Sequence, residues 1–205
     1  TTTTTNAVLE RKVAKVGLVT TRGFRDTLEL GRRTRPRPYG MTGTFEPLIE
    51  RERRIEIDER MNVAGEVVTP LAEDQLADAV RALLAMGCES LVIHFLHAYA
   101  NPAHELRAGE IARALWPNDY ITLGHALLSE FREYERGTTA SVNAAVQPIL
   151  DRYVRRLQGE VGGFSGQVGV AVLMRYTLRL LTLQQFQRAA ALICWGSRPV
   201  QRGAP

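Results

Sequence analysis

The sequence predicts a layered α/β fold with parallel strands, and two observations support this. Residues 90–96 (SLVIHFL) are almost entirely apolar, which is typical of a strand covered on both faces. Apolar residues at helical spacing occur on both sides of this strand, in residues 76–84 and 108–115. A further strand at 120–123 and an amphipathic helix at 142–157 complete an alternation of helices and strands typical of α/β domains.

The first third of the chain extends this pattern. Asn6 followed by good helix formers predicts a short helix that begins near this residue. Residues 15–20 predict a buried strand, residues 23–26 turn into a short helical piece, and residues 54–58 alternate as a strand does. Residues 31–47 contain three prolines and three glycines, so we expect a loop or arm there.

Cap residues and breakers delimit the helices. We expect Gly87 to end the helix before the apolar strand. Asn101 as N-cap and Pro102 at the first helical position predict the start of the next helix. Pro148 predicts a kink in the long amphipathic helix.

Composition and charge restrict the possible functions. The net charge of +4 belongs to the tail, because residues 175–205 hold five of the 26 basic residues and none of the 22 acidic ones; residues 1–174 therefore carry −1. This argues against a nucleic-acid-binding protein. No apolar run is long enough to span a membrane, so we expect a cytoplasmic protein. Two cysteines, Cys88 and Cys194, have no metal-ligand spacing, and we expect Cys88 to be a small buried hydrophobe.

Residues 129–143 are the richest candidate for chemistry, because they place carboxylates, guanidiniums, hydroxyls and a phenol between a strand end and a helix start. Ligands commonly bind at this position in α/β folds. Arginine can recognise carboxylate or phosphate, and glutamate can orient water. The alternative is a solvated cluster of mutually paired charges, which the sequence alone favours. The candidate substrate or cleft residues are Glu130, Arg132, Glu133, Tyr134, Glu135, Arg136, Thr139 and Asn143.

The histidines do not predict a metal site. Residues three apart on a strand face opposite sides, so His94 and His97 chelate together only if the strand ends between them. We expect His94 to be a hydrogen-bonded core residue, and His97 and His104 to have loop or capping roles. No metal ligand is assigned.

The opening threonines are the candidates for a nucleotide. Hydroxyl and amide groups of Thr3, Thr4 and Asn6 could donate to a phosphate, although a threonine run is also common in irregular chain. The arginine-rich residues 31–37 are read as a solvated arm, because no aromatic residues alternate with them. Walker, G-x-G-x-x-G, H-E-x-x-H and G-x-S-x-G motifs are absent from the sequence.

Several stretches together resemble the hydantoinase A / 5-oxoprolinase family. They follow one another in the expected order and at the expected spacing over about residues 1–160. The stretches are residues 3–12 (TTTNAVLERK), 16–26 (VGLVTTRGFRD), 95–105 (FLHAYANPAHE), 130–136 (EFREYER), 143–144 (NA) and 147–148 (QP).

The resemblance implies an actin- and sugar-kinase-like (ribonuclease H-like) fold, in which two α/β domains enclose ATP and Mg²⁺. It implies hydrolysis of cyclic amides such as 5-oxoproline or N-methylhydantoin, while relatives carboxylate ketones. A ring amide resists water because resonance deactivates its carbonyl, and phosphorylation of the oxygen removes that protection. The resemblance also implies a B-type partner subunit or domain. The resemblance further implies that Mg²⁺ and arginine stabilise the transferring phosphoryl group electrostatically, as in other phosphoryl transfers.

The family pattern also predicts the domain organisation. We expect residues 1–160 to be the N-terminal domain without its first strands, and residues 161–205 to be a linker and a degenerate start of the second domain. The family's glycine-rich phosphate motifs are absent, and residues 175–205 read as degenerate or out of frame. We therefore expect a fragment of a longer product that is inactive alone. The alternatives are a non-catalytic remnant or interaction module that docks a B-type partner, and a subunit of an ATP-dependent ketone carboxylase.

Overall fold

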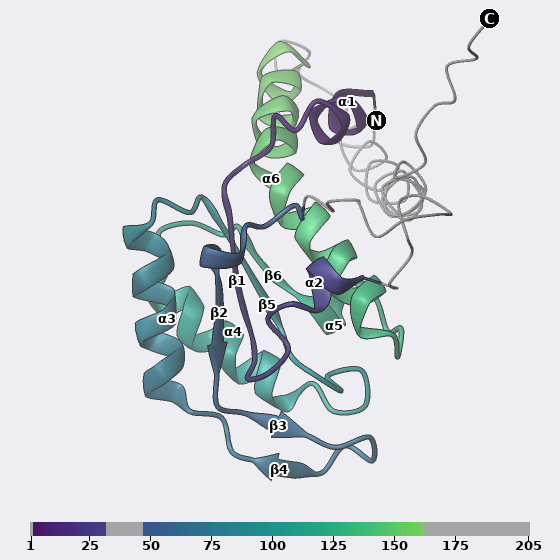
Figure 1. Ribbon diagram of the computed structural model, residues 1–205. Coiled ribbons are helices and arrows are strands. Elements are labelled where there is room, and N and C mark those ends of the chain that lie inside the picture. Colours follow the sequence, from purple (N-terminus) through teal and green to yellow (C-terminus); the bar gives the residue numbers. More distant parts are fainter. Residues whose placement is uncertain (1, 32–46, 162–205) are drawn as a thin grey trace, which may run out of the picture.

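The computed structural model describes residues 2–31 and 47–161, which are built around a four-stranded sheet (Figure 1). All neighbouring strands of this sheet are parallel. Parallel neighbours require crossover connections, and helices supply them here. The predicted α/β fold with parallel strands is confirmed. The strands lie in the order β2 (Arg54–Ile57), β1 (Val16–Thr21), β5 (Ser90–His94) and β6 (Ile121–Leu123).

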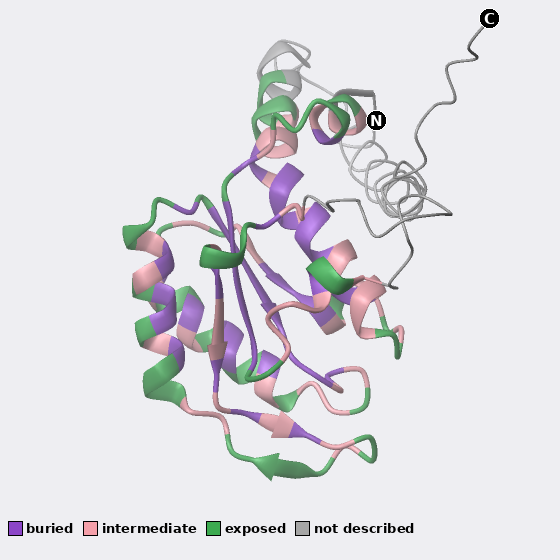
Figure 2. Cartoon of the chain, viewed as in Figure 1, coloured by how far each residue is buried: buried purple, intermediate pink, exposed green. Residues whose placement is uncertain are grey.

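The two central strands form the middle of the core. Every residue of β1 and β5 is buried, and Figure 2 shows the helices that cover them on both sides. This double coverage explains why both strands are nearly continuous apolar runs. The strand predicted at 90–96 is two residues too long, because β5 ends at His94 and residues 95–97 leave the sheet.

One face of the sheet is covered by α3 (Glu73–Ala85) and α4 (Ala103–Leu115). On α3 the predicted stripe is confirmed at Leu76, Val80 and Leu83, which have no exposed surface; Leu84 is only partly buried. Gly87 follows the helix with φ +76°, a left-handed conformation that glycine adopts at little cost. Cys88 is a free, buried thiol, as predicted.

The helix α4 begins one residue later than predicted. Pro102 is at its cap position, and the side-chain oxygen of Asn101 accepts the Ala103 N–H at 3.0 Å. Asn101 thus satisfies an N–H of the first turn as a capping residue does, although it lies one position further out. Ala108 and Ala112 form the fully buried part of the predicted stripe.

The opposite face is covered by α6 (Glu133–Val161) and by the short helix α2 (Thr27–Leu30). The residues through which α6 contacts the sheet are small, which lets its backbone approach the strands closely. Leu28 of α2 packs into the same cluster. The helix residues are Ala140, Ala144 and Ala145, and the strand residues are Val16, Leu18 and Val92.

Pro148 lies inside α6, and the structure compensates for it. A proline has no N–H, so the carbonyl four residues earlier, that of Ala144, loses its helical partner. The hydroxyl of Ser90 donates to this carbonyl at 2.9 Å. The next carbonyl, that of Ala145, accepts the N–H of Ala14 at 2.9 Å. The proline therefore lies where Ser90 at the start of β5 and Ala14 just before β1 can hydrogen-bond to the helix.

The first helix, α1, runs from Thr2 to Leu9, so the prediction of a start near Asn6 is wrong by four residues. Val8 is buried against Val142 and Val146 of α6. This packing stabilises helical structure in a threonine run whose intrinsic helix propensity is low, as tertiary contacts often do.

Smaller elements complete the described chain. They are the 3-10 turn η1 (Arg51–Arg53), the antiparallel pair β3 (Arg60–Met61) and β4 (Val67–Thr69), and α5 (Gly124–Leu127). Most of the predicted arm (32–46) and the predicted second domain (from 162) lie outside the described residues, so the boundary near residue 160 stays a prediction. No helix in the described part is both long and apolar enough to cross a bilayer.

Candidate functional site

The candidate segment 129–143 is mostly helix, because the helix predicted over 142–157 begins earlier, at Glu133. Glu130 and Arg132 precede α6, whereas the other six candidates lie within it, because the helix begins at Glu133. Acidic residues at 133 and 135 suit the positive end of the helix dipole, which explains why a charge-rich segment can be helical.

Glu133 and Arg136 are the two candidates that the structure brings together. They form an ion pair one helical turn apart. Arg136 is fully buried and also donates to the carbonyls of Phe95 at 3.0 Å and Glu130 at 2.8 Å. Glu133 accepts the N–H of His97 at 3.1 Å. The pair therefore ties the start of α6 to the segment that follows β5.

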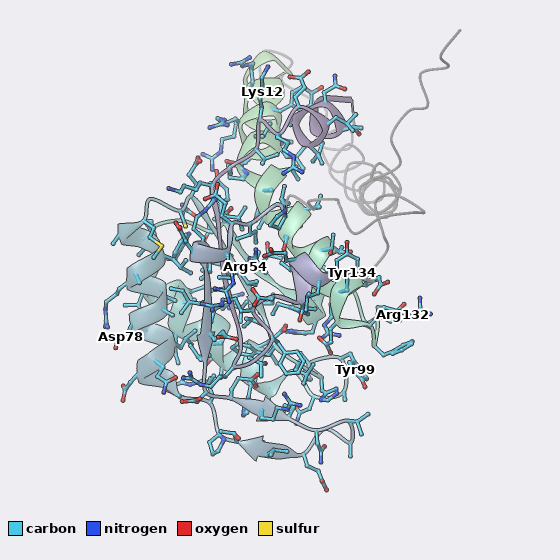
Figure 3. All side chains as sticks on the ribbon, viewed as in Figure 1. Lys12, Arg54, Asp78, Tyr99, Arg132 and Tyr134 are labelled. Atoms are coloured by element: carbon cyan, nitrogen blue, oxygen red, sulfur yellow. The ribbon has the colours of Figure 1, made fainter. Side chains whose placement is uncertain are left out.

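Glu130 joins this pair through its carbonyl, and three further candidates have contacts elsewhere. Tyr134 contacts the region of Gly31, because a Cβ on that glycine would be 3.5 Å from its ring. Asn143 donates to the Thr122 hydroxyl at 3.0 Å and so links α6 to β6. Arg132 is exposed, with its guanidinium over the Phe131 ring, and Figure 3 shows it on the same side of the molecule as Tyr99.

Thr139 has a role within α6 itself. The Thr139 hydroxyl donates to the carbonyl of Glu135 one turn earlier, at 2.8 Å. This is a common bond for threonine within a helix and indicates no ligand.

The nucleotide candidates lie elsewhere. Thr3, Thr4 and Asn6 belong to α1, and Asn6 is exposed. In Figure 1, α1 lies at the opposite end of the molecule from the β3–β4 hairpin, toward which β1, β2 and β5 run. The structure therefore does not bring these residues to the segment around Glu133.

A second carboxylate at the strand ends, Glu105 of α4, was not singled out from sequence for this role. It is fully buried, and its Oε1 accepts the Phe95 N–H at 2.8 Å. Its Oε2 accepts the backbone N–H of His125 at 2.9 Å and the ring Nδ1 of the same residue at 2.6 Å. The sequence signal was weak: a glutamate in the first turn of the helix that follows a buried strand.

A third carboxylate, that of Glu59, follows β2. It accepts the Thr21 hydroxyl, which in turn accepts the Leu96 N–H at 2.9 Å. It also bonds to His104 Nδ1 at 2.9 Å. Burial raises the pKa of Glu59, and its bonds to Thr21 and His104 oppose that rise.

Glu59, Glu105 and Glu133 together form what we call the carboxylate cluster. Directly or through Thr21, it satisfies the three successive N–H groups of residues 95–97, which β5 leaves unpaired at its end. Burial raises the pKa of Glu133, and the neighbouring Arg136 opposes that rise. Each carboxylate has a basic partner, which offsets the cost of burying it. These partners are His104, His125 and Arg136.

His94, the last residue of β5, lies next to the carboxylate cluster. Its Nε2 is 3.5 Å from Glu133, while Nδ1 is buried without a hydrogen-bond partner among the described residues. The prediction of a core histidine is confirmed, but the hydrogen bond expected of it is missing at Nδ1. Burial lowers the pKa of His94 to about 4, so the ring is neutral. Gly124 and Gly137 leave room for it: a Cβ on either would approach the ring to 2.8 and 2.9 Å.

The other two predicted histidine roles differ from each other. His97 lies in a loop, as predicted, with φ +57° and its Nδ1 2.9 Å from the Met61 carbonyl. His104 lies in α4 and bonds to Glu59 rather than capping the helix. Within residues 2–31 and 47–161, no three His, Cys, Asp or Glu side chains are placed to hold a metal ion.

A parallel sheet with helices on both faces makes this an α/β domain, and its likeness to two solved structures, caprolactamase and acetone carboxylase, agrees with an actin-like, ribonuclease H-like fold. Residues 1–116, more than half of the chain, match the family model described as "Hydantoinase/oxoprolinase N-terminal region". The chain belongs to this family, and the resemblance seen in the sequence is confirmed.

Relatives and solved structures agree with this assignment. An uncharacterized protein of Methanocaldococcus jannaschii is 37% identical over 75% of this chain and 23% of its own length. The structure of ATP-dependent caprolactamase from Pseudomonas jessenii has a TM-score of 0.70 at 30% identity, covering 76% of this chain and 23% of that one. Nucleotide-free acetone carboxylase has a TM-score of 0.69 at 25% identity, covering 77% and 24%. The chain thus spans about a quarter of the length of these three proteins.

Proposed function

We propose that this chain is part of an ATP-dependent enzyme that opens a cyclic amide, of the 5-oxoprolinase or N-methylhydantoinase type. The observation that supports the proposal most is the likeness to ATP-dependent caprolactamase, with a TM-score of 0.70. Caprolactam is a cyclic amide, and the family description names two further activities on cyclic amides. We place the enzyme in the cytoplasm, where ATP is available.

The described residues do not fit a nucleotide site. At the carboxyl edge of the sheet, where α/β proteins commonly bind phosphate, the N–H groups of Phe95 and His97 already bond to glutamates. The carboxylate cluster is also engaged with N–H, hydroxyl, histidine and arginine partners, so it is not arranged to hold Mg²⁺. We therefore propose that ATP and Mg²⁺ are bound mainly by residues outside the described part of the chain.

The contribution of this chain is a rigid carboxyl edge. The carboxylate cluster fixes residues 95–97 against α4 and α6, and Arg136 adds a cation–π contact with Tyr99 at 5.6 Å. A fixed edge of this kind positions neighbouring side chains without further ordering cost when a substrate binds. We also propose a B-type partner subunit, since the similar caprolactamase chain is named as subunit alpha.

The likeness to acetone carboxylase favours a second candidate, a subunit of an ATP-dependent ketone carboxylase. One assay separates the two. The natural protein that carries this sequence, copurified with its partner, is tested for ADP release with 5-oxoproline, N-methylhydantoin or caprolactam, and with acetone plus bicarbonate. We expect a cyclic amide to stimulate ADP release and to appear as the ring-opened product.

Stimulation by acetone plus bicarbonate alone would replace the proposal with the carboxylase. If none of these substrates stimulates ADP release and the protein still binds its partner stably, the result would favour a non-catalytic interaction module.

A further inference from the structure

The end of the molecule formed by α1 and the C-terminal part of α6 exposes apolar side chains. The two helices pack together through Val8, which contacts Val142 and Val146 (Figure 1). Tyr153 lies about two turns beyond Val146 on the same stripe of α6, and it is 38% exposed. Leu9, next to Val8, is 68% exposed. Apolar surface of both helices is therefore accessible at this end.

Positive charge borders this apolar surface. Arg152 and Arg156 of α6 are both exposed. Arg156 lies three positions after Tyr153 and four after Arg152, so it neighbours both on the surface of the helix. We call Leu9, Arg152, Tyr153 and Arg156 the α1–α6 surface.

The acids next to this surface in the sequence already have partners. Asp151 pairs with Arg155 at 2.8 Å, and Glu10 pairs with Lys12 at 2.9 Å. Figure 3 shows Lys12 at this end of the molecule. Within the described part of the chain, no ion pair joins either arginine of the α1–α6 surface to a carboxylate. Two like charges one turn apart also disfavour the helix, so an acid from another molecule would stabilise it.

Charge and composition together indicate which partner fits. Tyrosine and arginine are enriched at protein interfaces, and apolar centres with charged rims are common there. The chain's own residues 175–205 do not fit, because they hold five arginines and no acid and would be repelled. An acidic surface of another protein chain fits better. Two similar proteins are named as subunits, caprolactamase subunit alpha and acetophenone carboxylase gamma subunit.

We propose that the partner subunit binds to the α1–α6 surface through an acidic patch of its own. Its carboxylates pair with Arg152 and Arg156, and its apolar side chains cover Leu9 and Tyr153. This rests on the partner subunit of the proposed function. Since α6 also carries Glu133 and Arg136 at its other end, one helix then connects the partner with the carboxylate cluster.

The test uses the natural protein that carries this sequence and its partner subunit, purified separately and mixed in a calorimeter at low and moderate salt. Arg152→Glu/Arg156→Glu reverses both charges of the α1–α6 surface. Leu9→Asp places a charge in its apolar part. All three residues are exposed, so we expect the Tm of the free protein to stay close to that of wild type.

Matched controls lie on α3 and α4, which cover the opposite face of the sheet from α6. Arg81→Glu/Arg113→Glu makes the same change of net charge at two exposed arginines. Leu106→Asp makes the same change of polarity at a leucine that is 49% exposed.

We expect the double charge reversal to raise Kd for the partner about 100-fold or more at low salt, and Leu9→Asp to raise it about tenfold. Both controls should stay within about threefold of wild type. The affinity of the wild type should fall as salt rises, because salt screens exposed charges. Added duplex DNA should not displace the partner.

Wild-type Kd in both surface variants, in a complex that still opens a cyclic amide, would overturn this inference and leave the proposed function intact. Equal weakening by the controls, or displacement of the partner by DNA, would also overturn it. If the surface variants alone weaken binding but the wild-type complex opens no cyclic amide, the surface is confirmed and the proposed reaction is refuted.

Discussion

The neutral, buried His94 should make the fold sensitive to acid. Burial lowers its pKa from 6.5 to about 4, an effect that the charge of Glu105 opposes and that of Arg136 reinforces. In the unfolded chain the ring is solvated and takes up a proton near its ordinary pKa. Between these two pKa values the unfolded state binds more protons than the folded state. Stability is therefore fully present above pH 6.5, falls as the pH drops toward 4, and levels off below that.

The size of this loss follows from the two pKa values. The difference between 6.5 and about 4 corresponds to a maximum of about 3 kcal/mol, since one pH unit is worth about 1.4 kcal/mol. Between pH 7 and pH 4.5 most of it is expressed, about 2 kcal/mol. This is a large share of the stability of an ordinary domain, about 5–15 kcal/mol.

Other groups titrate in the same range, so a variant must isolate His94. Burial raises the pKa values of Glu59 and Glu133, and a raised carboxyl pKa adds stability as the pH falls, which is the opposite sign. His94→Gln removes the titrating ring but keeps a donor near Glu133. Urea unfolding of both proteins from pH 7 to pH 4.5 gives the free energy of each.

We expect the stability of the wild type relative to His94→Gln to fall by about 2 kcal/mol over this range. If the two proteins show parallel pH dependence, the ring is not kept neutral by burial and the reasoning is refuted.

Three substitutions test other features of the fold. Gly137→Ala should destabilise by about 1–3 kcal/mol, although alanine favours helix, because its Cβ would lie 2.9 Å from the His94 ring. Ser90→Ala should cost about 1–3 kcal/mol, because the Ala144 carbonyl opposite Pro148 would lose its donor. Arg136→Met should cost about 3–5 kcal/mol, since it leaves the partly buried carboxylate of Glu133 without its cation and the Phe95 and Glu130 carbonyls without their donor. Urea unfolding at pH 7 measures all three.

Matched controls keep these expectations specific. Ser141→Ala removes a buried hydroxyl of α6 that donates only to a carbonyl one turn earlier, so it should cost less than Ser90→Ala. Arg81→Met breaks an exposed pair with Asp78 and should cost less than about 1 kcal/mol. Equal effects within either pair of variants would contradict the roles given to Ser90 and Arg136.

The sequence predicted the layers well because burial leaves a direct pattern in it. The apolar run around β5 and the stripe of Leu76, Val80 and Leu83 on α3 report which surfaces meet the core. Two helix starts were misjudged for one reason. The threonines of α1 and the charges that begin α6 are poor local signals, and the packing of Val8 and Arg136 that stabilises these helices is not local.

The candidate site was predicted only in part. The segment around Glu133 was singled out because charge was concentrated there, and in the structure Glu133 bonds to the segment that follows the central strand β5. Glu59 and Glu105 were missed, since neither belongs to the charge cluster in the sequence. Their importance comes from the N–H groups of residues 95 and 96 where β5 ends, and which distant side chains bond to these groups depends on how the crossover connections return to the sheet.

The junction at Pro148 has a mechanical consequence. A helix bends most readily where a rung of its hydrogen-bond ladder is missing, so α6 has its lowest stiffness at this level. A force on the C-terminal end of α6 would be transmitted to the sheet through the hydrogen bonds of Ser90 and Ala14 to the helix carbonyls. We therefore expect a partner that pushes on the C-terminal end of α6 to bend the helix at Pro148 without displacing the acid–base network at its N-terminal end.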